Sequence, residues 1–179
     1  MQGVYSIEAY DALKNNEIWT TIHSIAQIPL AQKYIDDLVF WIKINTGMNR
    51  LGFQVNELDQ FKPFIKENNV LMTHLACADN PHDELNHIQF SQFDYVWKHT
   101  GEILLRSVIN SAGASNFPDQ SHDWLRVGIG MYGGLPNMPE LKTAMTFRSQ
   151  IIGFQDLKLG ERIGYGLSLI HISEPTRQF

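Results

Sequence analysis

The alternation of short apolar runs with helix-like segments is the feature of this sequence that most constrains its fold. Runs of strand length, rich in apolar, β-branched and aromatic residues, cover residues 18–22, 38–44, 70–75, 103–109 and 124–127. Helix-like segments lie between them, at residues 7–14, 24–34, 55–65 and 85–100. Strands that alternate with helices predict a parallel sheet in an α/β fold, either an eight-stranded βα barrel or an open doubly wound sheet.

The predicted helices carry signals at their ends. Ser6 is expected to cap the first helix and Asn56 the third, because side-chain oxygens accept hydrogen bonds from the first turn. Pro29 lacks the N–H that a helix interior needs, so the second helix is expected to begin near it. Gly101 is expected to end the fourth helix as its C′ residue. One face of that helix is marked by Leu85, Ile88, Gln92, Val96 and Trp97.

Polar residues suited to chemistry follow several of the predicted strands. They are Lys43 and Arg50, then His74, then Asn110 and Ser111, and finally Arg126. Barrel enzymes gather functional residues from the ends of several different strands. The pattern therefore favours a (β/α)8 barrel over an open sheet.

The sequence pattern changes after the Pro-Asn-Met-Pro segment at residues 136–139. Residues 143–157 have β character, residues 158–161 are typical of a turn, and no helix signal follows. We therefore predict a βα-barrel domain over residues 1–137 and the start of a β-rich C-terminal domain over residues 138–166.

Composition narrows the classes of partner. The net charge is −5, and the 14 Lys and Arg residues are scattered rather than striped, which argues against nucleic acid and anionic membranes as partners. The single cysteine, Cys77, excludes an internal disulfide framework, and neither a signal peptide nor a membrane span is evident. No histidine pairs with Cys or carboxylates at ligand spacing, so we predict no metal. A cytoplasmic protein with a small-molecule partner is expected.

Residues 41–53 read Trp-Ile-Lys-Ile-Asn-Thr-Gly-Met-Asn-Arg-Leu-Gly-Phe and place Lys43, Thr46 and Arg50 around a glycine-hinged loop. This segment resembles the Lys-x-Asp/Asn-Thr-Gly-Met-x-Arg-Leu-Gly signature of bacterial alanine racemases, which are pyridoxal phosphate enzymes of fold type III. Further matches are Thr-His-Leu-Ala at 73–76, Asn-Ser-Ala at 110–112, Arg-Val-Gly-Ile at 126–129 and Gly-Tyr-Gly at 164–166. The resemblance spans about residues 4–166 and implies part of a (β/α)8 barrel followed by the start of a β domain.

The resemblance also implies a reaction, the interconversion of L- and D-alanine by two bases. Tyr165 matches the tyrosine base, supplied across a homodimer interface, and His74 and Arg126 match a hydrogen-bonded relay beside it. A phenol with a pKa of about 10 needs nearby cations or hydrogen-bond donors to act as a base at neutral pH. The other base is a lysine in an amino-terminal Lys-Ala-Asn-Ala-Tyr-Gly-type motif, which this sequence lacks. We therefore expect an internal fragment that is inactive alone, from an enzyme that supplies D-alanine for peptidoglycan.

The cofactor contacts implied by the resemblance involve most of the polar residues already noted. Arg126 matches the arginine that donates to the pyridine nitrogen; since arginine keeps its proton, that nitrogen would stay unprotonated. The phosphate contacts match Asn110, Ser111, Gly128 and Ile129. Arg50 matches the arginine that faces the phenolic oxygen and the substrate carboxylate. Lys43 matches a lysine that is carbamylated in several family members.

Alternative interpretations concern both the activity and the ends of the chain. A non-catalytic pyridoxal-phosphate-binding barrel protein and a racemase for another small amino acid, such as serine or lysine, both share parts of this pattern. Residues 128–133 also satisfy Gly-x-Gly-x-x-Gly, but no acidic residue follows at the spacing of a dinucleotide site, so we reject that interpretation. Residues 167–179 resemble a translated transposon-type sequencing adapter and are expected to be non-native.

Overall fold

The structure is a computed structural model that describes residues 3–135, 138–158 and 160–161. The chain divides into two compact units, Met1–Met145 and Thr146–Phe179. All helices and strands of the described residues belong to the first unit. The domain boundary at residues 137/138 stays a prediction, and the expected adapter-derived tail lies outside the described residues.

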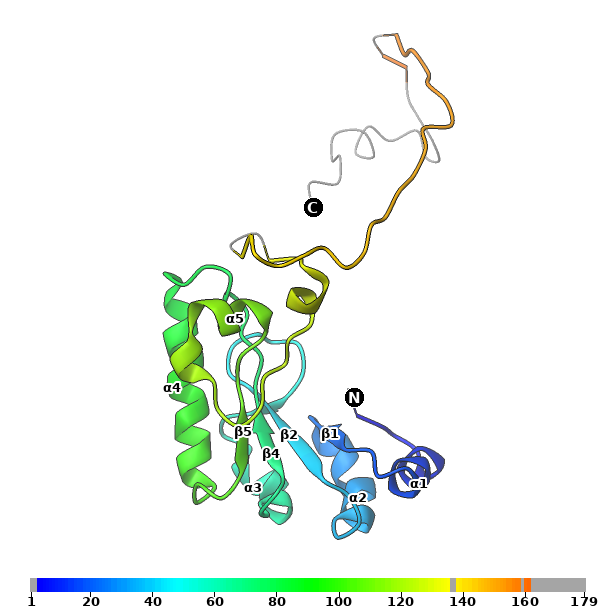
Figure 1. Ribbon diagram of the computed structural model, residues 1–179. Helices are drawn as coiled ribbons and strands as arrows, with labels where there is room; N and C mark the ends of the chain where they lie inside the picture. Colours follow the sequence, from blue (N-terminus) through cyan, green and yellow to red (C-terminus); the bar gives the residue numbers. More distant parts are fainter. Residues whose placement is uncertain (1–2, 136–137, 159, 162–179) are drawn as a thin grey trace. The chain divides into compact units, whose positions relative to one another are not determined.

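The first unit is built on a parallel sheet whose strands follow the order of the chain (Figure 1). The strands β1 (Thr20–Ile22), β2 (Phe40–Asn45), β4 (Val70–Met72) and β5 (Leu105–Ser107) lie side by side, and β3 (Phe53–Gln54) pairs with the end of β2. A doubly wound sheet reverses its strand order at a switch point, whereas a barrel adds each strand beside the previous one. The observed order supports the prediction of a partial (β/α)8 barrel.

Helices connect these strands and follow several of the predicted signals. The helical elements are α1 (Ile7–Asn15), η1 (Ile25–Gln27), α2 (Ile28–Ala31), η2 (Gln32–Tyr34), α3 (Leu58–Phe61), η3 (Lys62–Phe64), α4 (Glu84–His99), α5 (Ser111–Asn116), η4 (Pro118–Gln120) and η5 (Ile129–Tyr132). Ser6 caps α1 by accepting a hydrogen bond from Ala9 N (3.2 Å), as predicted. Gly101 lies just past the end of α4 at φ 74°, and the prediction of a C′ glycine is confirmed.

The predicted helix over residues 55–65 is a single α-helical turn followed by a 3-10 turn. Pro63 lies in the first turn of η3, where it can donate no hydrogen bond and restricts the residue before it. Asn56 is not the cap, because Glu57 takes the N-cap position of α3 and its carboxylate accepts a hydrogen bond from Gln54 N (2.8 Å) instead. The prediction for Pro29 is confirmed, since it lies in the first turn of α2.

The predicted buried face of α4 is partly wrong. Ile88 is 49% exposed, so it does not belong to the packed face. The buried residues of the helix are Asn86, Gln89, Phe93 and Val96. The two buried amides were missed because apolar periodicity alone does not identify polar side chains that bind main-chain groups of a neighbouring loop.

Two further predictions of β structure are wrong for the described residues. Residues 124–127 make only an isolated bridge, Asn110↔Arg126, because the chain turns into η5 three residues after Arg126. Residues 143–157 form no strand. Their large apolar side chains are exposed, as at Phe147 (92%) and Phe154 (82%). A main-chain hydrogen bond from Ala144 N to Tyr132 O (3.2 Å) does not continue into the ladder of hydrogen bonds that a strand needs.

The sheet separates a packed outer face from an inner face. Along β2, Phe40, Ile42 and Ile44 are buried, whereas Trp41 and Lys43 point to the other side and are partly accessible. The outer residues join a core with apolar side chains of the helices, including α4, which runs lengthwise beside the sheet (Figure 1). The inner face and the carboxyl ends of the strands carry the candidate site.

Candidate active site

A pocket of about 240 Å³ opens at the carboxyl ends of the parallel strands. It is lined by His74, Asn110, Ser111, Ala112, Arg126, Gly128 and Ile129. These residues come from three successive loops, which a parallel sheet brings to one edge. The predicted phosphate contacts and both described members of the predicted relay therefore lie around a single pocket.

Arg126 is held at this pocket by acceptors from two neighbouring strands. Its guanidinium donates hydrogen bonds to Thr73 O, to Ser107 Oγ and to Val108 O (3.1 Å). Burial lowers the pKa of Arg126 to about 10, which still leaves it protonated at neutral pH. These hydrogen bonds hold the positive charge of Arg126 at the edge of the pocket.

The strand register explains why a second cation lies near Arg126. Lys43 pairs with Met72, and Met72 pairs with Ser107, so these inner-face residues form one layer across β2, β4 and β5. Ser107 is also an acceptor for Arg126. Burial is the main cause that lowers the pKa of the Lys43 ammonium, and the charges of Arg50 and Arg126 lower it further.

His74 experiences the same group of cations. Burial lowers the pKa of His74 to about 4, and Arg126, Lys43 and Arg50 add to the effect in that order. The imidazole is therefore neutral at pH 7. A neutral imidazole has one ring nitrogen that donates and one that accepts a hydrogen bond, so His74 can bridge a protonated and an unprotonated partner.

Ser111 joins the two loops that form the other side of the pocket. Its Oγ accepts hydrogen bonds from Gly128 N (2.9 Å) and Gly130 N (3.1 Å), and only 4% of the residue is exposed. The hydroxyl proton remains available as a donor to a ligand. Asn110 caps α5, because its Oδ1 accepts a hydrogen bond from Gly113 N (2.9 Å), and its Nδ2 donates to Leu75 O (3.3 Å) of the loop after β4.

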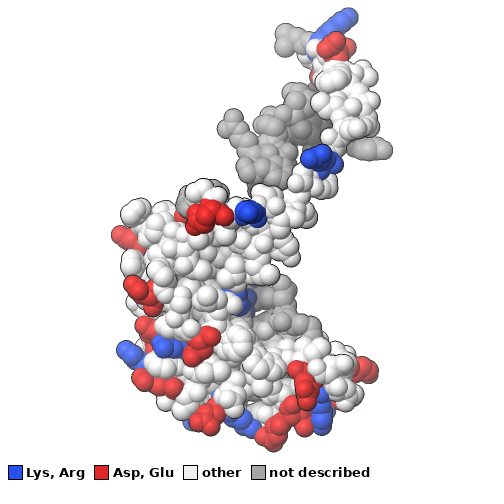
Figure 2. Space-filling view, viewed as in Figure 1, with Lys and Arg blue, Asp and Glu red and all other residues white. Residues whose placement is uncertain are grey.

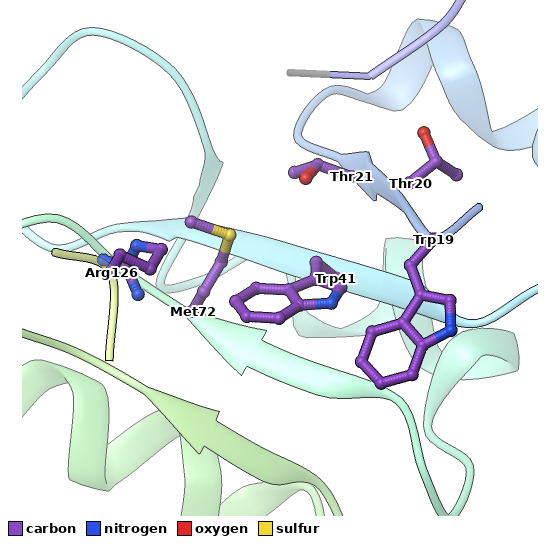
Figure 3. Close-up of a pocket in the computed structure, with 6 residues that line it drawn as sticks. All are labelled: Trp19, Thr20, Thr21, Trp41, Met72 and Arg126. Carbon is purple, nitrogen blue, oxygen red and sulfur yellow. The ribbon is translucent and has the colours of Figure 1, made fainter. Parts of the chain in front are cut away.

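Arg126 also borders a second pocket, of about 310 Å³, on the inner face of the sheet (Figure 3). The side chains of Arg126, Met72, Trp41 and Trp19 lie in succession along it, with Thr20 and Thr21 on the adjacent β1. Trp124 contacts both tryptophans, with ring centroids 5.4 Å from Trp19 and 6.0 Å from Trp41. The lining of this pocket is apolar except at Arg126 and the two threonines.

Surface charge, possible metal ligands and helix length are the other features on which the sequence predictions depend. Figure 2 shows a face on which acidic and basic side chains are interspersed without a basic stripe. Within the described residues, no cluster of three or more His, Cys, Asp or Glu side chains has the arrangement of a metal site. No helix of the described chain is long and apolar enough to cross a membrane.

Four predicted site features are not assembled around the pocket. Lys43 lies on the inner face of β2 and does not line it. Arg50 is exposed on the loop between β2 and β3, where it is close enough to affect the pKa of His74 without lining the pocket. No hydrogen bond joins His74 to Arg126 in the described structure, where the guanidinium donates to the three acceptors named above. Tyr165 lies outside the described residues.

Sequence reasoning missed the residues that support the site. Ser107 and Thr73 hold Arg126, and Gln89 of α4 binds both the loop after β2 and the loop after β4. A polar residue at an inward position of a buried strand could have indicated Ser107. The signal for Gln89 was its spacing from Phe93 and Val96 on the buried face of α4.

Comparison with known proteins agrees with the geometry. The sequence profile of the family described as "Alanine racemase, N-terminal domain" matches residues 1–136. An alanine racemase of Nitrosomonas eutropha is 34% identical and aligns with 99% of this chain and 53% of its own length. The chain thus spans about half the length of the relatives it matches.

Solved structures give the same result. The alanine racemase structure from Acinetobacter baumannii has a TM-score of 0.69 at 32% identity, covering 94% of this chain and 51% of that protein. An alanine racemase from Bartonella henselae, solved with covalently bound pyridoxal phosphate, shares the fold with a TM-score of 0.67 at 22% identity, over 78% of this chain and 44% of its own. The chain belongs to the alanine racemase family, and its first 136 residues correspond to the N-terminal domain of that family.

Proposed function

We propose that the complete protein containing this chain is an alanine racemase that interconverts L- and D-alanine with pyridoxal phosphate. The observation that carries the proposal is the pocket where His74, Ser111, Arg126 and Gly128 meet, in a chain of this family. We further propose that the enzyme is a cytoplasmic homodimer and that its D-alanine enters peptidoglycan synthesis.

The residues around the pocket fit the cofactor. Ser111 has a hydroxyl proton free to donate to a phosphate, and Gly128 and Ile129 bring main-chain groups to the same wall. Arg126 supplies a protonated guanidinium to the same pocket, suited to an unprotonated pyridine nitrogen. When bound, pyridoxal phosphate supplies an electron sink that acidifies the α-proton of an amino acid.

The chain's own residues would tune and orient this chemistry. Neutral His74 can accept a proton or hydrogen bond on one ring nitrogen while the other donates, which fits a place between Tyr165 and Arg126 in the proposed relay. The cations around His74 also favour a phenolate over a phenol at a nearby tyrosine. Arg50, a planar donor on an exposed loop, is assigned to the substrate carboxylate.

Lys43 is proposed to carry a carbamate. Its lowered pKa raises the fraction of neutral amine, the form that reacts with carbon dioxide, and a carbamate would replace repulsion from Arg50 by attraction. A crystal structure of the complete enzyme tests this assignment. Electron density for a carboxyl group beyond Nζ is expected, and clear density for an unmodified ammonium would reject it.

Turnover of the complete protein tests the proposed function directly. D-alanine formation from L-alanine, and the reverse, should depend on added pyridoxal phosphate, while serine and lysine should be poorer substrates. The Tyr165→Phe variant should bind the cofactor but lose racemisation. Cofactor binding without any racemisation by the unsubstituted protein would favour a non-catalytic barrel protein, and preferred turnover of serine or lysine would favour a different racemase.

Mixed dimers test whether Tyr165 acts across the interface. A dimer of one Tyr165→Phe subunit and one Arg50→Leu subunit has one intact site if each site uses its own Arg50 and the partner's tyrosine. Random reassociation of the two inactive variants should then restore about a quarter of the normal activity, because half the dimers are mixed and each has one working site. No recovery, with mixed dimers demonstrated by mass, would place Tyr165 in its own subunit's site.

A further inference from the structure

We infer that Gln89, a residue of the outer helix α4, is a positioning residue that orients His74 and the loop leading to Arg50. Its side-chain amide is fully buried and joins the loops that follow β2 and β4. The expected effect of Gln89 on turnover rests on the proposed function, whereas its effect on His74 rests only on contacts within this chain.

Three hydrogen bonds connect Gln89 to these two loops. Its Nε2 donates to His74 O (3.0 Å) and to Thr46 Oγ1 (3.1 Å), and its Oε1 accepts from Ala76 N (2.9 Å). His74 and Ala76 lie just beyond the end of β4, where the sheet no longer provides main-chain partners. The amide therefore provides hydrogen-bond partners for main-chain groups that the sheet leaves unpaired.

A directed chain of hydroxyl groups continues from Gln89 into the sheet. Thr73 Oγ1 donates to Ile44 O (3.0 Å), so the 2.7 Å contact between the two threonines requires Thr46 to donate to Thr73. The sequence of donors is thus Gln89, Thr46 and Thr73, ending on a carbonyl of β2. These three side chains are buried, with exposures of 0%, 0% and 1%. Such a satisfied buried network fixes one arrangement of the groups it joins.

The network ends at two groups of the candidate site. Thr73 O accepts a hydrogen bond from the Arg126 guanidinium, and the next residue is His74. On the other side, Thr46 precedes Gly47, which lies against α4: a Cβ at Gly47 would be 3.5 Å from Gln89 Cγ. The network does not include Ser111 or its glycine partners. A change at Gln89 should therefore disturb the His74 side of the pocket and leave the phosphate side intact.

The test compares Gln89→Met with Asn86→Leu in the complete protein. Met has nearly the length of Gln but makes none of the three hydrogen bonds. Asn86 is a matched control, since it is equally buried on α4 and binds main-chain carbonyls of Cys77 and Asn80 without reaching Thr46 or His74. A third variant, Thr46→Val, removes the first hydroxyl of the chain at nearly constant volume.

Two measurements distinguish positioning from a general loss of stability. In the apoprotein, NMR titration of His74, assigned with a His74→Gln variant, should show a rise of its pKa toward the ordinary value in Gln89→Met and Thr46→Val but not in Asn86→Leu. In the loaded enzyme, kcat should fall about 10- to 100-fold in the first two variants, while pyridoxal phosphate affinity stays within about threefold.

The possible results separate a failure of the Gln89 inference from a failure of the proposed function. An unchanged His74 titration in both Gln89→Met and Thr46→Val would overturn the inference, as would equal losses of kcat in Asn86→Leu and Gln89→Met. If Gln89→Met does not fold, Thr46→Val alone decides by the same two measurements. If the unsubstituted protein binds the cofactor but does not racemise alanine, the proposed function fails, whereas the apoprotein titration still tests Gln89.

Discussion

Removing the hydroxyl of Ser111 is the sharpest test of the phosphate side of the pocket. In Ser111→Ala, Gly128 N and Gly130 N both lose their acceptor, at present 2.9 and 3.1 Å away. Gly128 is exposed and can bind water instead, whereas Gly130 is buried and its N–H is left without a partner. One buried unsatisfied donor costs about 1–3 kcal/mol, so the free energy of unfolding of Ser111→Ala should be lower by an amount in that range.

The same substitution should weaken cofactor binding. A hydrogen bond to a charged group contributes roughly 1.5–3 kcal/mol, so loss of the Ser111 donor to a phosphate should raise the Kd about 10- to 150-fold. The assay is a titration of the complete apoprotein with pyridoxal phosphate, followed by absorbance and tryptophan fluorescence. Ser115→Ala, on the same helix but outside the pocket lining, is the control and should bind normally. A Ser111→Ala Kd within about twofold of the unsubstituted value would refute the phosphate assignment.

Two further predictions follow from the structure. The pKa of His74 is about 4 in the folded protein and 6.5 in the unfolded chain, so the unfolded state binds more protons between pH 4 and pH 6.5. The free energy of unfolding should therefore fall as the pH drops from 6.5 to 4, by at most about 3 kcal/mol. Urea titrations across this range check the slope, and a slope unchanged in His74→Gln would show that His74 is not its cause. Gly52 has φ 130° and a Cβ there would lie 2.6 Å from Asn45 N, whereas Gly101 has φ 74° and open space around it. Gly101→Ala should therefore cost about 1–2 kcal/mol and Gly52→Ala clearly more, as measured by chemical denaturation, and equal costs would contradict the steric argument.

The fold was predictable where a local pattern and the tertiary contacts agree. The buried run that became β2 and the caps at Ser6 and Gly101 depend on neighbouring residues, and the structure places them as expected. The break at Pro63 also had a local cause that was visible in the sequence but was outweighed by helical spacing. The absence of a strand at residues 143–157 had no local signal, because strand formation depends on a partner rather than on propensity.

The residues that line the candidate site could be predicted from the sequence, but the residues that hold them in place could not. His74, Ser111 and Arg126 carry distinctive chemistry after strand ends, and the parallel sheet brings them together. Ser107 accepts a hydrogen bond from the Arg126 guanidinium, and Gln89 donates to a main-chain carbonyl and a hydroxyl group of two loops. A single sequence cannot show which buried polar residue will meet which loop, because that depends on the register of strands and the rotation of a helix.

The register of the sheet links the charge state of the site to its fold. Because Lys43, Met72 and Ser107 share one layer, Arg126 cannot bind Ser107 without approaching Lys43. Burial is the main cause that lowers the pKa of His74 and of Lys43, and the resulting group of cations lowers both further. A slip of one residue between β2 and β4 would turn Lys43 toward the helices, remove one of the cations that act on His74 and raise the pKa of His74. The pairing of three short strands thus contributes to the lowered pKa values of His74 and Lys43.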